Sequence, residues 1–176
     1  LDTAGRARGE HLDVLVPDAA NEAEARAALA GLPVRFHRIP FGDIWMRDIA
    51  PIFVHAADGS VAAARFRFNG WGGKYALPHD ADVAERVAVA SGLSTQAFDF
   101  VLEGGSVEVD GEGTILTSEQ CLLNPNRNPT LDRAAIERAL CEALGGTKVL
   151  WVTEGLLHDH TDGHIDTIAR YVAPGV

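Results

Sequence analysis

The sequence lacks the features that mark several large classes of protein. It has only two cysteines, Cys121 and Cys141, too few for a disulfide framework and consistent with a reducing compartment. No apolar run approaches the roughly 18 residues that a transmembrane helix needs, and residues 1–10 lack the apolar stretch of a signal peptide. We therefore expect a cytoplasmic protein without a membrane partner.

Positive charge is also scarce. The chain has 15 Lys and Arg against 25 Asp and Glu, for a net charge of −10 and a pI near 5.0. Such a surface repels nucleic acid and anionic membranes and favours small cations. The glycine-rich stretch 69–73 does not follow the GxGxxG pattern, so it predicts no phosphate site. We expect a positive or neutral ligand and no nucleic-acid partner.

Length and composition indicate one domain or part of one. With 176 residues, of which 47% are hydrophobic, the chain can bury a core. It begins without methionine, which favours an incomplete single domain over residues 1–176. The sequence predicts no metal or cofactor, and it leaves the oligomeric state open, a homo-oligomer included.

The stretch 157–171 holds the densest group of ionisable residues. Three histidines and three aspartates lie within residues 158–166, and Gly163 permits a tight turn before His164. Apolar residues then alternate from Ile165 to Tyr171, which predicts a half-buried strand with His164 and Asp166 on one face. An imidazole beside a carboxylate is typical of proton-transfer sites. The alternative is a solvated loop, because Asp-Gly is above all a turn signal.

Hydrophobic periodicity predicts alternating strands and helices. Turn residues separate the predicted elements, and Asn21 and either Thr130 or Asp132 are candidate helix N-caps. Strands are expected over residues 11–16, 34–39, 49–55, 61–68, 95–100, 106–110, 114–117 and 148–153. Helices are expected over 21–30, 80–90 and 131–144, with loops at 40–48, 57–59, 69–73 and 102–105.

The order of strand, acidic loop, hairpin and helix recurs along the chain. Asp48, Glu103 and Asp166 stand at matching points, 55 and 63 residues apart. Repeats of this length are typical of propeller-like assemblies, in which the matching loops would converge on one axis. The alternative is an ordinary α/β sheet, in which such spacing arises without a repeat.

The predicted loop 40–48 combines acids with an aromatic residue. A carboxylate beside an indole suits a planar cation, because a guanidinium donates paired N–H groups and stacks on aromatic rings. Asp43, Trp45 and Asp48 supply these groups. Alternatively, Arg47 pairs with Asp43 or Asp48 within the fold and Trp45 belongs to the core. Glu103, before two glycines, could likewise be an exposed turn acid.

Five ordered blocks carry a family resemblance. They are D-I-W-M-R-D-I-A-P, F-N-G-W-G-G-K-Y, L-E-G-G-S-V-E-V-D-G, C-L-L-N-P-N-R-N-P and T-D-G-H-I-D-T-I-A-R-Y-V-A-P-G. Together they make the sequence, from about Val34 to Pro174, resemble the agmatine deiminase and bacterial peptidylarginine deiminase family. The resemblance implies an α/β pentein fold, a five-bladed propeller of ββαβ units. About half of its modules would lie in this chain.

The resemblance also implies a site and a reaction. Asp48 and Asp166 correspond to the carboxylates that bind the guanidinium, His164 to the general acid/base and Glu103 to its supporting acid. Trp45 is a wall of the implied site and Trp71 a weaker one. The family forms a covalent adduct on a cysteine from a glycine-rich C-terminal block, which this sequence lacks. Its two cysteines are therefore expected to be structural.

The expected substrate is a small cationic guanidino compound. Agmatine, giving N-carbamoylputrescine and ammonia in polyamine biosynthesis, is favoured over peptidyl arginine. Two other functions remain as alternatives. One is a metal-dependent hydrolase, suggested by His158-x-His160-x-Asp162-x-His164, although Gly163 separates the last pair. The other is a non-catalytic guanidino-binding module.

Overall fold

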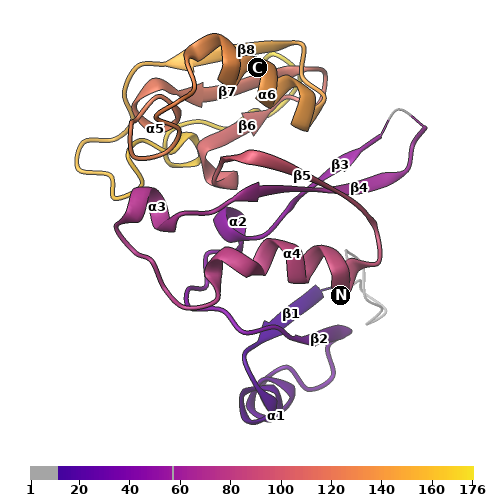
Figure 1. Cartoon of the computed structure of the whole chain (residues 1–176). Coiled ribbons are helices and arrows are strands. Elements are labelled where there is room, and N and C mark those ends of the chain that lie inside the picture. The colour runs from indigo at the N-terminus through magenta and orange to yellow at the C-terminus, as the bar shows by residue number, and fades with distance from the viewer. Residues whose placement is uncertain (1–11, 57) are drawn as a thin grey trace.

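The computed structural model describes residues 12–56 and 58–176, and Figure 1 shows the order of its elements. The start of the first predicted strand, His11, and residue Ala57 of the predicted turn lie outside the described residues. The strands are β1 Leu12–Val16, β2 Val34–Arg38, β3 Ile52–His55, β4 Val61–Arg67, β5 Ser94–Val101, β6 Val107–Val109, β7 Thr114–Ser118 and β8 Lys148–Val152. The helices are α1 Ala19–Ala28, α2 Met46–Ile49, α3 Gly70–Gly73, α4 Asp80–Ser91, α5 Glu119–Leu122 and α6 Arg133–Leu144, with 3₁₀ turns Gly104–Ser106 and Ile165–Thr167.

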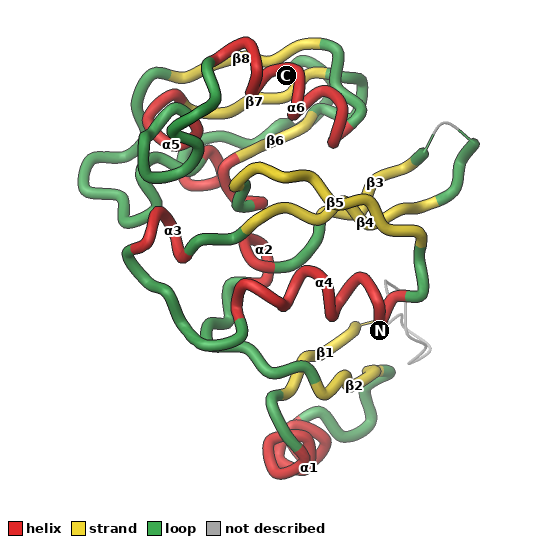
Figure 2. The backbone as a smooth tube through the Cα atoms, in the orientation of Figure 1, coloured by secondary structure: helices red, strands yellow, loops and turns green. Residues whose placement is uncertain are grey.

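The described strands form three separate sheets rather than one. β1 and β2 pair in parallel, β3-β4-β5 form a second sheet and β6-β7-β8 a third. Each three-stranded sheet is built the same way: an antiparallel hairpin is followed by a helix, and a parallel strand then pairs with the hairpin's second strand. Figure 2 shows the three sheets stacked through the molecule, with α4 between the first and the second.

The predicted repeat is therefore present as two successive ββαβ units. Asp48 lies four residues before the start of β3, and Glu103 lies four residues before the start of β6. The alternative of a single ordinary α/β sheet is wrong, because the strands of the two units do not pair with each other. The five-bladed propeller stays a prediction, because the described residues hold only these two complete units.

Each unit has its own part of the core. The larger cluster joins the end of β5, the β6–β7 hairpin and α6, whose buried stripe Ile136, Leu140 and Ala143 follows helical spacing. The smaller cluster consists of Ile49, Trp71 and Val83. Its position links the short helix α2 and the turn α3 to α4, so the loops that follow the strands are held against packed elements.

The structure corrects the predicted N-cap of α1 and decides between the two candidates for the N-cap of α6. α1 begins at Ala19 and is capped by Asp18, not by Asn21, because the Asp18 carboxylate accepts a hydrogen bond from the Asn21 N–H at 2.9 Å. For α6, Asp132 rather than Thr130 is the cap, since its side chain accepts from Ala135 N at 2.8 Å. The loop predicted over 40–48 also runs into the helical turn α2, and the one over 69–73 contains α3.

The predicted strand from Ile165 to Tyr171 is wrong. The chain instead forms a 3₁₀ turn over Ile165–Thr167, in which the carbonyl of Ile165 accepts the N–H groups of Ile168 and Ala169, both at 2.9 Å. The Thr167 hydroxyl donates to the carbonyl of His164 at 2.7 Å. Alternating side chains do not suffice for a strand, because a strand also needs a neighbour for its backbone groups. Among the described helices, none is long and apolar enough to cross a membrane.

Asn128 provides a test of how the second unit is joined to the first. Its side chain accepts from Val101 N at 2.9 Å and donates to Val101 O at 3.0 Å, so it pairs with the end of β5 just before Glu103. We expect Asn128→Ala to lower the free energy of unfolding by about 2 kcal/mol, because two buried backbone groups lose their partners. Urea unfolding measures this change.

Asn124→Ala is the matched control. Asn124 donates to the carbonyl of Gln120 at 3.3 Å and accepts from Asn126 N at 3.2 Å, both longer contacts outside the buried core, so its replacement should cost about 1 kcal/mol or less. Equal losses for the two variants would show that the pairing of Asn128 with Val101 does not stabilise the fold.

Candidate functional site

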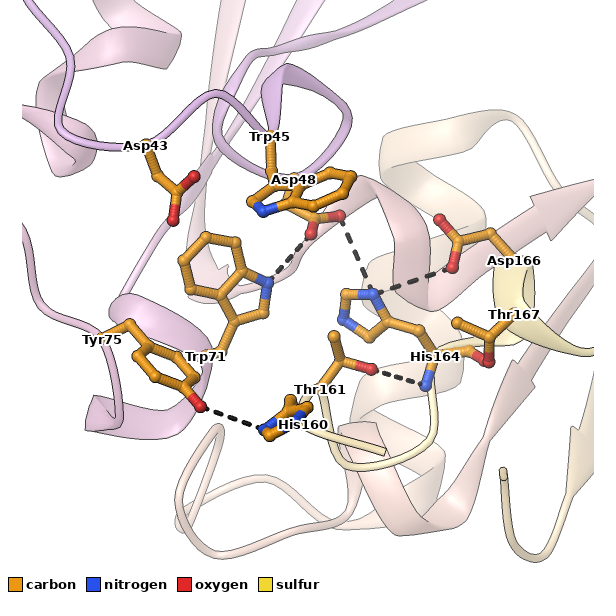
Figure 3. A pocket seen from close by; sticks show the side chains of 10 residues that line it. All are labelled: Asp43, Trp45, Asp48, Trp71, Tyr75, His160, Thr161, His164, Asp166 and Thr167. Atoms are coloured by element: carbon orange, nitrogen blue, oxygen red, sulfur yellow. Dashed lines mark hydrogen bonds and ion pairs between the residues drawn. The ribbon is translucent and has the colours of Figure 1, made fainter. Parts of the chain in front are cut away.

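A cavity of about 460 Å³ lies where loops from both units meet. Figure 3 shows the ten side chains around it, which come from the α2 loop, the α3 turn, the loop before His164 and the 3₁₀ turn after it. The lining residues are Asp43, Trp45, Asp48, Trp71, Tyr75, His160, Thr161, His164, Asp166 and Thr167. Three carboxylates, two histidines and aromatic rings therefore face one cavity.

Asp48 is fixed by two hydrogen bonds. The α2 turn buries its side chain, one carboxylate oxygen accepts from the indole Nε1 of Trp71 and the other from the Gly105 N–H, both at 2.9 Å. Burial raises the pKa of Asp48, and the two donors act against this rise. The carboxylate is thus held in one orientation by the protein itself.

Gly105 occupies the point where three site residues converge. A Cβ atom at this position would lie 2.5 Å from Oδ2 of Asp166 and 2.7 Å from both Oδ1 of Asp48 and Nδ1 of His164. Any side chain here would displace at least one of these groups. Glycine at position 105 is therefore a requirement of the site, because the backbone itself approaches the carboxylates.

His164 lies between the two aspartates but bonds to neither. Its Nδ1 is 3.8 Å from Oδ1 of Asp48 and 3.9 Å from Oδ1 of Asp166, beyond hydrogen-bond distance. Its backbone N–H is held by Asp159 Oδ2 and Thr161 Oγ1, both at 3.1 Å. Burial lowers the pKa of His164 to about 4, so its imidazole is neutral at pH 7.

Asp166 completes the group at the cavity. Burial raises the pKa of its carboxyl, and the neighbouring His164 opposes that rise. Its side chain is 32% exposed, more than that of Asp48 at 9%. The predicted closeness of His164 and Asp166 is therefore found, although a 3₁₀ turn rather than a strand produces it.

Glu103 lies behind this group, away from the cavity. Its side chain is fully buried, so the alternative that Glu103 is an exposed acid in a turn is wrong. One oxygen accepts from Nε of Arg127 at 2.7 Å, and the other has no hydrogen-bond partner among the described residues. Burial raises the pKa of Glu103, and the Arg127 cation opposes the rise. Glu103, Cys121 and His164 can bring one polar atom each within 4.8 Å of one another.

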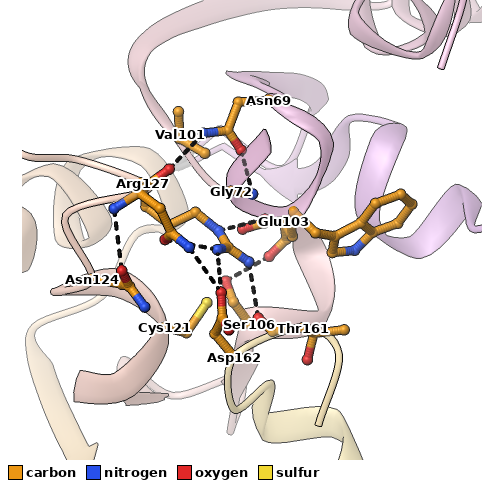
Figure 4. Close-up of polar contacts among 12 residues, drawn as sticks. Asn69, Gly72, Val101, Glu103, Ser106, Cys121, Asn124, Arg127, Thr161 and Asp162 are labelled. Carbon is orange, nitrogen blue, oxygen red and sulfur yellow. Dashed lines mark hydrogen bonds and ion pairs between the residues drawn. The ribbon is translucent and has the colours of Figure 1, made fainter. Parts of the chain in front are cut away.

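Arg127 is the supporting residue that sequence reasoning missed. Its side chain is completely buried, and Figure 4 shows its guanidinium between three segments of the chain. Besides Glu103, it donates to Oδ2 of Asp162 at 2.8 Å and to the carbonyl of Thr161 at 2.8 Å. The signal was present in the C-L-L-N-P-N-R-N-P block, but local sequence does not show which distant acids an arginine meets.

Asp162 and Lys74 join two loops beside the cavity. Lys74 forms a short ion pair with Asp162 and donates to the carbonyl of His160 at 2.8 Å. Burial alone would raise the pKa of Asp162, but hydrogen bonds led by that from Lys74 lower it. The Tyr75 hydroxyl also lies 3.1 Å from Nδ1 of His160. Tyr75 and His160 were not predicted to line the cavity, and they do.

The two tryptophans differ in how firmly they are held. Trp71 is 4% exposed, bonds to Asp48 and meets Phe68 edge-on at 4.9 Å between ring centroids. Trp45 is 59% exposed, so its placement in the core is excluded. Both rings line the cavity, with the buried Trp71 as its fixed wall and the exposed Trp45 as its outer one.

The alternative in which Arg47 pairs with Asp43 or Asp48 is wrong. Arg47 donates to the carbonyl of Val107 at 3.0 Å and lies 3.9 Å from Glu108. It therefore fastens the α2 turn to β6 of the next unit. Its cation stays outside the cavity, where it leaves the site acids free for a ligand.

The described residues contain two groups with metal-ligand types close together. They are Glu103–Cys121–His164 and Asp48–His164–Asp166. Arg127 places a cation against the first group, and the second opens to the cavity. The spaced motif His158-x-His160-x-Asp162-x-His164 does not assemble, because Asp162 is bound by Lys74 and Arg127 and His160 contacts Tyr75.

Neither cysteine faces the cavity. Cys121 is fully buried in the core, and burial raises the pKa of its thiol, which disfavours the thiolate. Cys141 lies on α6, where burial also raises its pKa. Both positions agree with a structural role for the two residues.

Known proteins share this sequence and architecture. A sequence model of the Porphyromonas-type peptidyl-arginine deiminase family matches residues 4–176. The agmatine deiminase of Ectopseudomonas mendocina is 44% identical over 163 residues, covering 89% of this chain and 44% of that protein. The chain thus spans about half the length of the curated relatives that it matches.

Solved structures agree in fold. The structure of an Enterococcus faecalis agmatine deiminase catalysing its reaction superposes with a TM-score of 0.86 at 37% identity, covering 93% of this chain and 46% of that one. A C. jejuni agmatine deiminase with a cysteine replaced by serine and with substrate bound gives a TM-score of 0.85 at 32% identity, covering 94% and 49%.

The neutral state of His164 predicts how stability responds to pH. Because its folded pKa of about 4 lies below the ordinary histidine value of 6.5, the unfolded chain takes up more protons between these two pH values. Protonation of His164 therefore leaves the free energy of unfolding unchanged above pH 6.5 and lowers it as the pH falls from 6.5 toward 4. We expect a contribution of about 3 kcal/mol, which is the shift expressed as free energy.

Urea unfolding of the wild type and His164→Gln at pH 7 and pH 5 tests this contribution. The variant should lose less stability on acidification than the wild type. His55→Gln, which removes an exposed histidine from β3, should behave like the wild type. Identical pH dependence in wild type and His164→Gln would contradict a buried neutral imidazole.

Proposed function

Because this chain belongs to the Porphyromonas-type peptidyl-arginine deiminase family, whose agmatine deiminases act on guanidino C–N bonds, we propose that it binds and deiminates a guanidino substrate. The observation that carries the proposal is the placement of Asp48 and Asp166 on either side of His164, at the wall of one cavity. A guanidinium would sit against both carboxylates and beside the imidazole.

The donor and acceptor inventory fits a guanidinium. A guanidinium offers five N–H donors in a plane, and each carboxylate has about four lone-pair sites that can accept them. Asp48 uses one site on each oxygen for Trp71 and Gly105, which leaves the remaining sites for the ligand. A bound cation would also lower the pKa of both carboxyls, which burial raises.

In the proposed reaction a cysteine thiol attacks the guanidinium carbon while its proton passes to the neutral imidazole of His164, and a tetrahedral adduct forms. His164 gives this proton to the departing nitrogen, ammonia leaves, and an amidino-thioether remains on the cysteine. The imidazole, neutral again, then takes a proton from water, whose oxygen attacks the same carbon. The C–S bond breaks to release the ureido product, and the imidazolium returns its proton to the sulfur.

The nucleophile of this reaction lies outside the 176 residues. Cys121 and Cys141 are separated from the cavity, and the raised pKa of each thiol opposes ionisation. The residues of this chain would bind and orient the guanidinium and move its protons. Glu103 would hold His164 in place from the buried side.

Agmatine is the substrate we propose. It is a small dication, and a chain of net charge −10 with acids in the cavity attracts such a molecule. The relatives named as agmatine deiminases support this choice. Peptidyl arginine, the substrate in the family's name, is the second candidate.

Calorimetric titration of the 176-residue chain with agmatine tests the binding step. We expect Asp48→Asn to weaken binding by about tenfold to a hundredfold, because it removes a charge-assisted pair. Asp58→Asn, which neutralises an acid on the exposed β3–β4 turn, should change binding less than about twofold. Equal effects of the two variants would contradict a guanidinium site at Asp48.

Ammonia release tests the catalytic step. The 176-residue chain should bind agmatine without releasing ammonia. If it does release ammonia, Cys121 becomes the candidate nucleophile and the proposal of a nucleophile outside these residues is wrong. In a longer natural form that does turn over, His164→Ala should lower kcat by about 10²–10⁴-fold while binding changes little. Faster ammonia release from a blocked arginyl peptide than from agmatine would contradict the proposed substrate but not the chemistry.

A further inference from the structure

Asp43 places a further carboxylate at the other end of the cavity, and the proposed reaction gives this carboxylate no role. In Figure 3 its carboxylate points into the cavity from the side of Trp71 opposite to His164 and Asp166. The cavity thus has acids at both ends. A substrate that filled it would meet Asp48 and Asp166 at one end and Asp43 at the other.

The carboxylate of Asp43 is held in place but not neutralised. The N–H groups of Gly42 and Asp43 both donate to Oδ1 of the buried Asp80, at 2.7 and 3.1 Å, which fixes this loop on the start of α4. Oδ1 of Asp43 accepts from Ile44 N at 2.7 Å. Within residues 12–56 and 58–176, no basic side chain pairs with it and its Oδ2 accepts no hydrogen bond.

Apolar rings separate the two acidic ends. Trp71 lies between them as the fixed wall, and the exposed Trp45 covers the outer side. Methylene groups lose no hydrogen bonds when they lie against indole rings, whereas a charged group there would lose its hydration. The sequence of acid, aromatic wall and acid therefore matches a molecule with two cations joined by an alkyl chain.

We propose that Asp43 binds the distal ammonium of the substrate and makes the site selective for dications. This inference rests on the proposed function, because it takes the guanidinium to lie at Asp48 and Asp166. A peptidyl arginine carries a neutral backbone at the corresponding distance from its guanidinium. Such a substrate would leave the Asp43 carboxylate desolvated and unpaired, which penalises it relative to agmatine.

The test compares agmatine with n-pentylguanidine, in which a methyl group replaces the ammonium. Calorimetric titration of the 176-residue chain should give at least about fivefold tighter binding of agmatine, as expected for one partly exposed charge-assisted contact. Asp43→Asn should remove most of this preference and change n-pentylguanidine binding less than about twofold. Asp43→Glu, which keeps the charge, should retain part of the preference.

Asp99→Asn is the matched control for net charge. Its side chain is 93% exposed and does not line the cavity, so its replacement should leave the preference for agmatine unchanged. A preference that survives Asp43→Asn, or an equal loss of both ligands in that variant, would overturn the subsite. In those cases n-pentylguanidine still binds the wild type and the guanidinium site stands. If neither ligand binds the wild type, the proposed function and this inference both fail.

Discussion

The ion pair between Arg127 and Glu103 is the interaction on which the site depends. Both side chains are completely removed from solvent, so each charge needs its partner: losing one partner of such a pair costs about 3–5 kcal/mol. The remaining donors of Arg127 reach Asp162 and the carbonyl of Thr161, in the loop that leads to His164. One guanidinium thus joins the acidic loop of the second unit to the loop that carries the histidine.

This support allows a group of acids to remain close together around an uncharged imidazole. Burial raises the pKa of Asp48, Glu103 and Asp166, and it lowers that of His164. Such an arrangement is unfavourable for the fold, because carboxylates are desolvated beside one another without a cation between Asp48 and Asp166. The charge of a cation bound between them would offset this repulsion, which is the physical basis of the proposed guanidinium site.

The repeated ββαβ unit explains how residues so far apart in sequence meet. Each acidic loop precedes a hairpin at the same offset, which places Asp48 and Glu103 at equivalent points of their units. Contacts between units then bring them together: Gly105, beside Glu103, donates its N–H to Asp48, and Arg47, beside Asp48, binds the carbonyl of Val107. The backbone of one unit therefore orients side chains of the other.

The sequence by itself determined the two hairpins, the helices α4 and α6 and the repeat, and it predicted as site residues Asp48, Glu103, His164 and Asp166, which the structure brings close together. These follow from local periodicity, turn residues and motif blocks, which need no knowledge of distant neighbours. Only the tertiary structure decided that residues 165–167 form a 3₁₀ turn, that Trp71 is held more firmly than Trp45, and that Arg127 supports the site. The physical reason is that strand pairing, burial and ion pairing depend on which segments meet, and a local pattern does not encode that.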